Sequence, residues 1–413
     1  MKVKVKSLIM LFIITLILLE CEFNYMVSLG PLSDLETVKL IKAFICVSVF
    51  FLYQGLSNKV PVARELRIVQ GLFAFIIPIN TLVSYASGMK MIDAVLNSSH
   101  YFFIFLIEPI CYLLFDKKNR KQLITIILAS GCLTLIMRSI MAFYYHYNNH
   151  IELFPGLSIG AGSKIRYSTF FGYNMLRVYP SCFGAVVLFG FAYIALESEK
   201  KLYKILASTV VGLVMAYYIL VYQSRGYTVI FGIELFILLL AKRYNKNRQI
   251  KNLVKYIIAF IAFYYVMSSE FVKNLLDSFS VHSELGESTS IRLVGIGLVF
   301  SKIITSFPFG IGGNNVFDSI AGLIYADDYG CLDFILKNNI LGLCVYIVLC
   351  KYIISWLYRT RRSKYNLLMM TLAMVFIASM LAVDNFLPRK IGAVPFVIAA
   401  FEYCRLEAKY YAD

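Results

Sequence analysis

The sequence has few of the features of a soluble enzyme. Only 15% of its 413 residues are charged, whereas soluble domains carry about a quarter. It has four histidines and one tryptophan, and its nine cysteines form no Cys-x-x-Cys pair. Neither a disulfide framework nor a zinc site is therefore expected. The mean hydropathy of +0.73 excludes a cytosolic globular enzyme.

Hydrophobic residues, in contrast, make up 60% of the chain and gather in runs of about 15 to 24 residues. Helices of this length can cross the hydrocarbon core of a bilayer. The sequence therefore predicts an all-α polytopic membrane protein, with one integral membrane domain over residues 1–413. Twelve spans are predicted, at residues 7–24, 38–56, 68–87, 100–115, 122–145, 179–196, 203–222, 227–241, 255–269, 335–357, 366–385 and 391–403. The last of them is short and contains Pro395.

The net charge of +16 reflects membrane topology. Of the 40 basic residues, 25 lie in loops on the side of the N-terminus and 10 in loops on the opposite side. Because basic loops tend to stay in the cytoplasm, both termini are predicted to be cytoplasmic. The basic residues therefore do not predict nucleic-acid binding. The first span follows three lysines without a small-residue cleavage site behind it, so it is expected to be a retained signal-anchor.

Two predicted external loops, residues 146–178 and 270–334, are much longer than a connection between spans requires. Loops of such length are usually functional or disordered. We expect the second loop to hold catalytic residues. Within it, residues 288–306 begin with a capping Ser-Thr-Ser sequence and are apolar except for a narrow polar stripe. This pattern predicts a helix in the outer membrane interface.

Five arginines are predicted at or near the external face. They are Arg225 in a tight turn after span seven, Arg166 and Arg177 in the first long loop, Arg292 on the interfacial helix and Arg138 in span five. A single arginine at a membrane surface is often only a snorkelling side chain. If these arginines converge, they form a site for a phosphorylated headgroup, because guanidinium groups bind phosphate oxygens bidentately. No Asp-x-Asp motif occurs in an external loop, so neither a metal ion nor another cofactor is expected at a pyrophosphate leaving group.

The second long loop also carries most of the external acidic residues. Asp327 and Asp328 precede Tyr329 and Gly330 just before span ten, where a carboxylate could accept a proton from a sugar hydroxyl. The alternative is an ordinary solvated acidic turn. The glycine-rich stretch 309–315 either offers amide groups to a phosphate or is a plain loop, because its spacing matches no nucleotide-binding motif.

Several short motifs, taken in order, resemble the O-antigen polymerase and ligase superfamily. They are Ser224-Arg225-Gly226, Ser290-Ile291-Arg292, Pro308-Phe309-Gly310-Ile311-Gly312, Asp328 to Leu332 and Asn339-Ile340-Leu341-Gly342-Leu343. The segment Arg177-Val178-Tyr179-Pro180, followed by Gly184, is similar to the arginine-bearing start of the sixth span in that family. The resemblance covers about residues 140–350.

The resemblance implies a metal-independent glycosyltransferase of the C type, with an undecaprenyl-diphosphate-linked glycan as donor. Ligases of the superfamily carry a histidine where this chain has Asp328, and the nearest external histidine, His282, lies far earlier in the loop. This departure favours a polymerase of the Wzy type. The alternatives are a ligase that transfers finished glycan to another acceptor, and a lipid-linked oligosaccharide flippase or other transporter.

We therefore predict a polymerase of oligosaccharide repeat units for a surface polysaccharide, O-antigen or capsule, on the external face of the bacterial cytoplasmic membrane. The predicted catalytic residues are Asp328, Arg225 and Arg292, and the predicted substrate-binding residues are Arg166, Arg177, Arg138, Asp327 and Tyr329. Its expected partners are the lipid-linked donor and acceptor, membrane lipid, a flippase and a chain-length regulator. No nucleic acid is expected among them.

Overall fold

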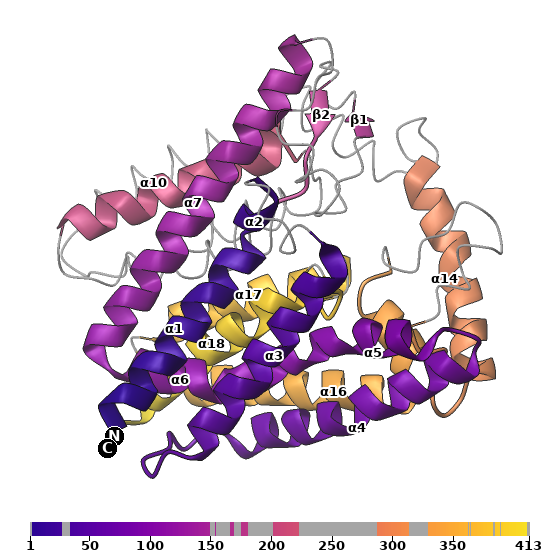
Figure 1. The fold of residues 1–413 in the computed structure, drawn as a ribbon, viewed down its shortest axis with the longest axis horizontal. Coiled ribbons are helices and arrows are strands. Elements are labelled where there is room, and N and C mark those ends of the chain that lie inside the picture. Colours follow the sequence, from indigo (N-terminus) through magenta and orange to yellow (C-terminus); the bar gives the residue numbers. More distant parts are fainter. Residues whose placement is uncertain are drawn as a thin grey trace.

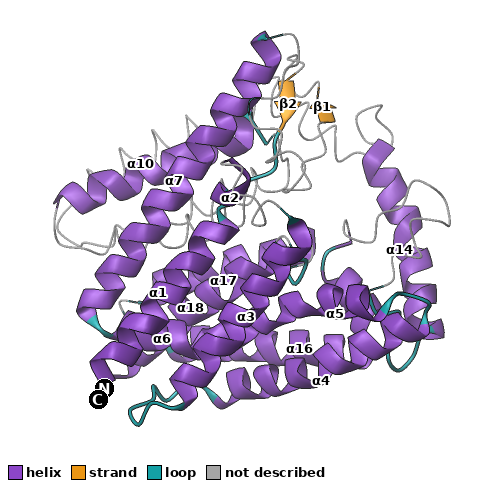
Figure 2. Cartoon of the chain, viewed as in Figure 1, coloured by secondary structure: helices purple, strands orange, loops and turns teal. Residues whose placement is uncertain are grey.

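A computed structural model describes residues 2–26, 34–148, 153, 166–168, 175–180, 201–222, 287–313, 329–361, 363, 365–382, 385–388 and 390–410. This part of the chain is almost entirely helical (Figure 2). The elements are α1 (Lys2–Glu20), α2 (Phe23–Met26), α3 (Leu35–Gln54), α4 (Arg64–Ala86), α5 (Met91–Ser99), η2 (His100–Leu106), α6 (Ile107–Phe115), α7 (Lys117–Tyr147), β1 (Arg166–Ser168), β2 (Met175–Arg177), α10 (Lys201–Leu220), α14 (Glu287–Thr305), α16 (Cys331–Arg359), α17 (Asn366–Ala382), η7 (Ile391–Ala393) and α18 (Val394–Tyr410).

Within the described ranges, four helical stretches are long and apolar enough to cross a membrane. They are α4, the run Met91–Phe115 that contains α5, η2 and α6, then α7 and α16. The prediction of a mostly helical chain with helices able to cross a membrane is therefore confirmed. Helices α1, α3, α10, α17 and α18 coincide with further predicted spans. The total of twelve stays a prediction, since 227–241, 255–269 and most of 179–196 lie outside the described residues.

Large apolar side chains cover the outside of the helical bundle. Phe44 and Phe51 on α3, Phe75 on α4 and Ile354 on α16 are each 61–69% exposed. A water-facing surface would rarely carry so many large apolar side chains, but a lipid-facing surface would.

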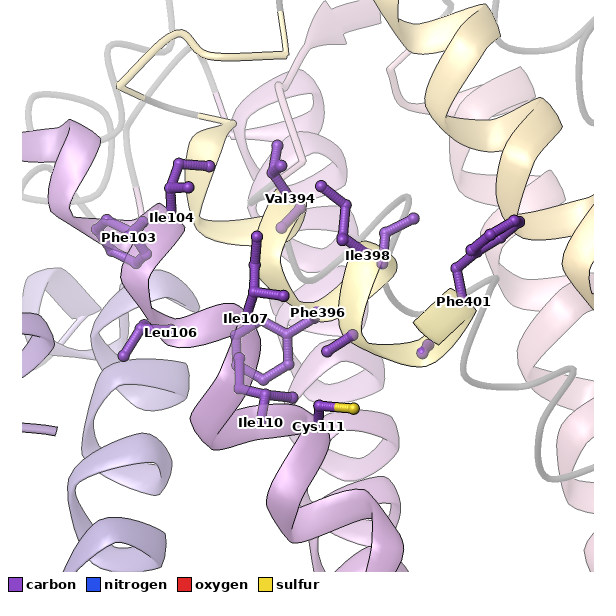
Figure 3. Close-up of a cluster of buried hydrophobic side chains, with 14 of the residues drawn as sticks. Phe103, Ile104, Leu106, Ile107, Ile110, Cys111, Val394, Phe396, Ile398 and Phe401 are labelled. Carbon is purple, nitrogen blue, oxygen red and sulfur yellow. The ribbon is translucent and has the colours of Figure 1, made fainter. Parts of the chain in front are cut away.

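Helix α18 is the most buried of the described helices, and residues 391–406 are all buried. Figure 3 shows its Phe396 and Ile398 beside Ile107, Ile110 and Cys111 of α6. The sequence presents this segment as a short span that contains Pro395. In the structure Pro395 lies in the first turn of α18, where a missing N–H group costs no intrahelical hydrogen bond.

The two chain termini lie at the same end of the bundle (Figure 1). At this end, which we call the terminal end, Lys6 of α1 forms an ion pair with Asp116 between α6 and α7. Arg120 of α7 donates a hydrogen bond of 2.5 Å to the Tyr403 hydroxyl of α18. These contacts place the beginning of α1 and the end of α18 at the same end of the bundle. Their location in the cytoplasm stays a prediction.

A buried ion pair within α18 is hydrogen-bonded to two other segments of the chain at the terminal end. Arg405 donates from two guanidinium nitrogens to the two carboxylate oxygens of Glu402, each at 2.6 Å. The Ala63 amide donates to one of these oxygens at 2.7 Å, and the Tyr352 hydroxyl donates to the other at 2.5 Å. Each oxygen thus accepts two hydrogen bonds, which is the pairing that a buried carboxylate needs.

Asp116 also caps α7, because its carboxylate accepts hydrogen bonds from the backbone N–H groups of Lys118 and Asn119. The hydrogen bond from Lys6, and then these backbone bonds, lower the pKa of the Asp116 carboxyl. We expect Asp116→Ala to cost about 1 kcal/mol of unfolding free energy at pH 7. Because the folded pKa is below the unfolded value of about 3.9, this stabilisation is lost as the pH falls below that value.

Thermal unfolding in detergent at pH 7 and at pH 3 tests this expectation. The difference between the wild type and Asp116→Ala should shrink at the lower pH. Asp116→Asn is the control, because asparagine also caps helices but has no charge to titrate. An equal difference at both pH values would show that the carboxylate charge does not stabilise this turn.

Candidate functional site

Helix α16 is broken near its start. Asn339 has φ 43° and ψ −118°, outside the helical region. A Cβ atom on Gly342 would lie 2.9 Å from the carbonyl oxygen of Phe334, although eight residues of straight helix span about 12 Å. Residues 331–338, the short arm of α16, therefore bend back toward the long part of the helix that follows Asn339. Only glycine at position 342 leaves room for this contact.

Residues with positive φ stand at both ends of the short arm. Gly330 has φ 60° and ψ −131°, close to the values of Asn339. Both residues match the first central position of a type II′ turn, where glycine, asparagine and aspartate predominate. For a residue other than glycine such a conformation costs about 1–3 kcal/mol. The Asn339 amide offsets this cost by donating to the Ile303 carbonyl of α14 at 2.7 Å.

The glycine-rich stretch donates hydrogen bonds to backbone carbonyls at the break in α16. The amides of Ile311 and Gly312 donate to the carbonyls of Leu336 and Lys337, both at 3.1 Å. These are carbonyls in the last turn of the short arm, which a broken helix leaves without intrahelical donors. Gly310 and Gly312 have φ values of 81° and 67°, and a Cβ on Gly310 would lie 2.4 Å from the Lys337 carbonyl oxygen.

The same stretch also reaches α4, since the Gly313 amide donates to the Ser84 hydroxyl at 2.7 Å. Residues 310–313 are therefore inserted between α4 and the short arm. Residues 310–313 form a loop, one of the two alternatives that the sequence left open, and this loop is packed inside the bundle. The amides of Ile311, Gly312 and Gly313 already donate to protein acceptors, so they are not free to hold a phosphate.

A buried network of polar side chains joins the short arm to α4, α5 and η2. The Asn80 amide donates to the Asn338 side-chain oxygen at 2.9 Å, and the Ser98 hydroxyl donates to the Asn80 side-chain oxygen at 3.0 Å. The Asn338 amide in turn donates to the Tyr101 hydroxyl at 3.3 Å. Polar groups inside an apolar bundle require partners of this kind. The network fixes the short arm against the bundle.

An ion pair lies on the short arm itself. Lys337 Nζ contacts Asp333 Oδ2 at 2.7 Å, and the Asp333 side chain is fully buried. Sequence reasoning did not place these residues in the site. The sequence feature that could have identified them is the polar triplet Lys337-Asn338-Asn339 within an otherwise apolar run. An ionisable residue inside a membrane span is a candidate functional residue by default.

Helix α14 packs along the short arm, and the two run in the same direction. Its Gly295 lies against Tyr329, so closely that a Cβ on Gly295 would be 1.7 Å from the Tyr329 hydroxyl oxygen. Val299 shares a buried cluster with Leu336 in the middle, and the Ile303 carbonyl meets Asn339 at the other end. Position 292 lies one turn before Gly295 on the same face of α14.

This packing bears on three predicted site residues. Tyr329 is buried at the start of the short arm, and Asp328 directly precedes it in the sequence. The structure therefore brings the backbone of Arg292 to within one turn of the contact with Tyr329. The structure does not describe Asp328, Asp327 or Arg225. The catalytic and binding roles of these residues, and those of Tyr329 and Arg292, stay predictions.

The first long loop supplies a β-hairpin in which two predicted residues face each other. Strands β1 and β2 are antiparallel, and the backbones of Arg166 and Arg177 are directly paired. The chain after β2 is held by two helices. The guanidinium of Arg138 on α7 donates to the Tyr179 carbonyl, and the Tyr217 hydroxyl of α10 donates to the Val178 carbonyl at 3.0 Å.

Arg138 is fully buried and also forms an ion pair with Glu22, next to α2. Its guanidinium therefore binds protein groups and holds the segment after Arg177 in place. Contact between Arg138 and a substrate stays a prediction. In the part of the chain that the structure describes, no group of three or more His, Cys, Asp and Glu side chains could hold a metal ion.

No protein-family model matches the chain, and no curated protein is significantly similar to it. Its function must therefore be inferred from its own residues and from the arrangement around the short arm of α16.

Proposed function

We propose that this chain is a membrane glycosyltransferase that polymerises undecaprenyl-diphosphate-linked oligosaccharide repeat units into a surface polysaccharide, O-antigen or capsule. In this proposal it has twelve spans and acts on the external face of the bacterial cytoplasmic membrane, with both termini in the cytoplasm. The observation that carries the proposal is the packing of α14 on the short arm, with Gly295 against Tyr329. It draws the backbone of Arg292 toward the residue that follows Asp328.

The placement of α14 also supports the proposal. Figure 1 shows α14 at the end of the bundle away from the chain termini, running across the direction of α4. A helix in the outer membrane interface would have this orientation relative to the spans, and the terminal end would then face the cytoplasm.

The pairing of two arginines in the β-hairpin favours an anionic substrate. Like charges at directly opposite positions of an antiparallel pair destabilise it, and Arg166 and Arg177 occupy such positions. A bound anion would relieve this repulsion. We propose that the donor pyrophosphate is this anion, held by these arginines together with Arg225 and Arg292.

The proposed reaction is a single displacement. The acceptor hydroxyl oxygen attacks the anomeric carbon of the donor sugar, and the bond from that carbon to the pyrophosphate oxygen breaks. Undecaprenyl diphosphate leaves with the electron pair, stabilised by the arginines, and Asp328 takes the hydroxyl proton. The configuration at the anomeric carbon is inverted.

Polymer formation by the purified protein is expected to continue in excess EDTA, because arginines and not a divalent cation stabilise the leaving group. The assay uses a lipid-linked repeat unit in detergent and separates products by length. Loss of polymer in EDTA, restored by magnesium or manganese, would contradict the arginine mechanism.

A deletion strain tests the proposal against the ligase alternative. Without a polymerase, single repeat units should still be exported and attached to the cell surface. Without a ligase, long chains should accumulate on the lipid carrier. Accumulation of long lipid-linked chains in the deletion strain would refute the polymerase proposal.

The broken helix favours transport of a lipid-linked oligosaccharide as a second candidate function. Transporters often bind substrates at discontinuous helices, and the break in α16 lies beside the buried Asp333–Lys337 pair. The detergent assay separates the two functions, because a transporter alone cannot lengthen a glycan in solution.

A further inference from the structure

We infer that Asn339 is a positioning residue that fixes α14 against the short arm of α16, and thereby sets the position of the Arg292 backbone relative to Tyr329. The roles of Arg292 and Asp328 rest on the proposed function. The coupling of the two helices through Asn339 rests on the contacts at the break.

The first step concerns the end of α14. This helix ends at Thr305, so the Ile303 carbonyl lies in its last turn, where its local donor is the Ser306 hydroxyl at 3.3 Å and not a backbone N–H group. The Asn339 amide supplies a donor at 2.7 Å and also lies 3.4 Å from the Ser306 hydroxyl. Asn339 is buried, so water cannot readily replace this bond.

The second step concerns the residue type. A φ of 43° at position 339 favours glycine, asparagine or aspartate. Of these three, only asparagine has an amide that can donate to a carbonyl oxygen. The position thus combines a backbone requirement with a hydrogen-bonding requirement, and asparagine alone meets both.

The third step concerns the geometry. Helix α14 touches the short arm at two distant points, Gly295 on Tyr329 and Ile303 at Asn339. The eight residues between these points rise about 12 Å along α14. Packing at Gly295 is not directional, whereas the hydrogen bond at Asn339 is. Without that bond, α14 can slide along the short arm, and position 292 moves with it.

The connecting stretch 310–313 strengthens this coupling. It follows α14 directly and is bonded to the carbonyls of Leu336 and Lys337, which lie just before Asn339. The end of α14, this stretch and the turn at Asn339 therefore form one connected unit.

The experiment uses the full-length protein in detergent with two variants, Asn339→Gly and Asn339→Asp. Both residues tolerate the backbone conformation and both lack the amide donor. The matched control is Asn366→Asp. The Asn366 side-chain amide also donates to a helix carbonyl, that of Leu357, at 3.2 Å. This bond lies at the other end of α16, far from the contact with α14. Spin labels introduced with a non-canonical amino acid at positions 297 and 343 report the distance between α14 and α16.

Both Asn339 variants are expected to broaden the distribution of label distances. They are also expected to lower kcat for polymerisation about tenfold or more per folded molecule, with the donor KM nearly unchanged, because small displacements of reacting groups slow chemistry more than binding. The control variant should change neither quantity. A residue needed only for folding would lower the yield of protein but not the kcat of the folded fraction.

An unchanged distance distribution in both variants would overturn the inference whatever the activity. A broadened distribution with unchanged kcat would overturn the positioning role. If the wild type itself forms no polymer from any lipid-linked repeat unit, the proposed function fails, while the distance measurement still decides whether Asn339 couples α14 to the short arm.

Discussion

Replacing Gly295 with leucine is expected to slow polymerisation about a hundredfold or more. A Cβ at this position would lie 1.7 Å from the hydroxyl oxygen and 2.5 Å from the Cζ atom of Tyr329. Tyr329 is 8% exposed and packed within a buried cluster, so its ring has little room to move. Helix α14 must then shift away from the short arm, and a displacement of about 1 Å at a reacting centre can cost a hundredfold in rate.

Gly297→Leu is the matched control for this prediction. Gly297 lies two residues further along α14, and a Cβ there would meet no atom within 4 Å. Both variants replace a glycine of α14 with leucine and so change the flexibility of the helix in the same way. A difference between their polymerisation rates therefore reports the contact with Tyr329. The rates are measured with a lipid-linked repeat unit at matched amounts of folded protein. Equal rates for the two variants would show that the α14 contact does not govern activity.

Asp328→Asn is expected to lower the rate of chain extension about a hundredfold or more. Asparagine keeps the size of aspartate but cannot accept the proton of the acceptor hydroxyl, and general-base catalysis typically contributes 10²–10⁴-fold. Asp318→Asn, which removes another carboxylate of the same loop, should leave the rate nearly unchanged. The length distribution of the polymer is the second readout. A normal distribution in Asp328→Asn would remove this residue from the mechanism and leave the arginine site to be tested separately.

The helices themselves could be predicted well from the sequence because long apolar runs have few other stable forms in a membrane. Helices α4, α7 and α16 all overlap predicted spans. The burial of α18 could not be predicted in this way. Its apolar residues would suit either lipid or a protein interior, and the neighbouring helices α6, α17 and η2 decide between them.

The break in α16 was also beyond what hydropathy can reveal. Apolar residues continue on both sides of the polar triplet Lys337-Asn338-Asn339, so the predicted span ran without interruption over residues 335–357. What breaks the helix is a set of hydrogen bonds from Ile311, Gly312 and Asn339 to carbonyls in other segments. Such bonds depend on the fold as a whole.

The candidate site was predictable only where its residues are close in sequence. Tyr329 and the glycine-rich stretch were both identified, but the sequence did not reveal that the stretch is bonded to the short arm. The network of Asn80 and Asn338 was missed, because these residues are 258 positions apart and each alone is an ordinary polar residue in a span. Contacts between residues so far apart in the chain cannot be predicted from a single sequence.

The position of α18 at the centre of the bundle has a consequence for biosynthesis. The carboxylate of Glu402 accepts a hydrogen bond from the Ala63 amide, which is synthesised 339 residues earlier. At about 5–20 residues per second, the ribosome needs roughly 20 to 70 seconds to cover that distance. For most of this time α6 has been synthesised but lacks the helix that buries Ile107, Ile110 and Cys111. The apolar surface of α6 is therefore without its final partner until translation passes Arg405.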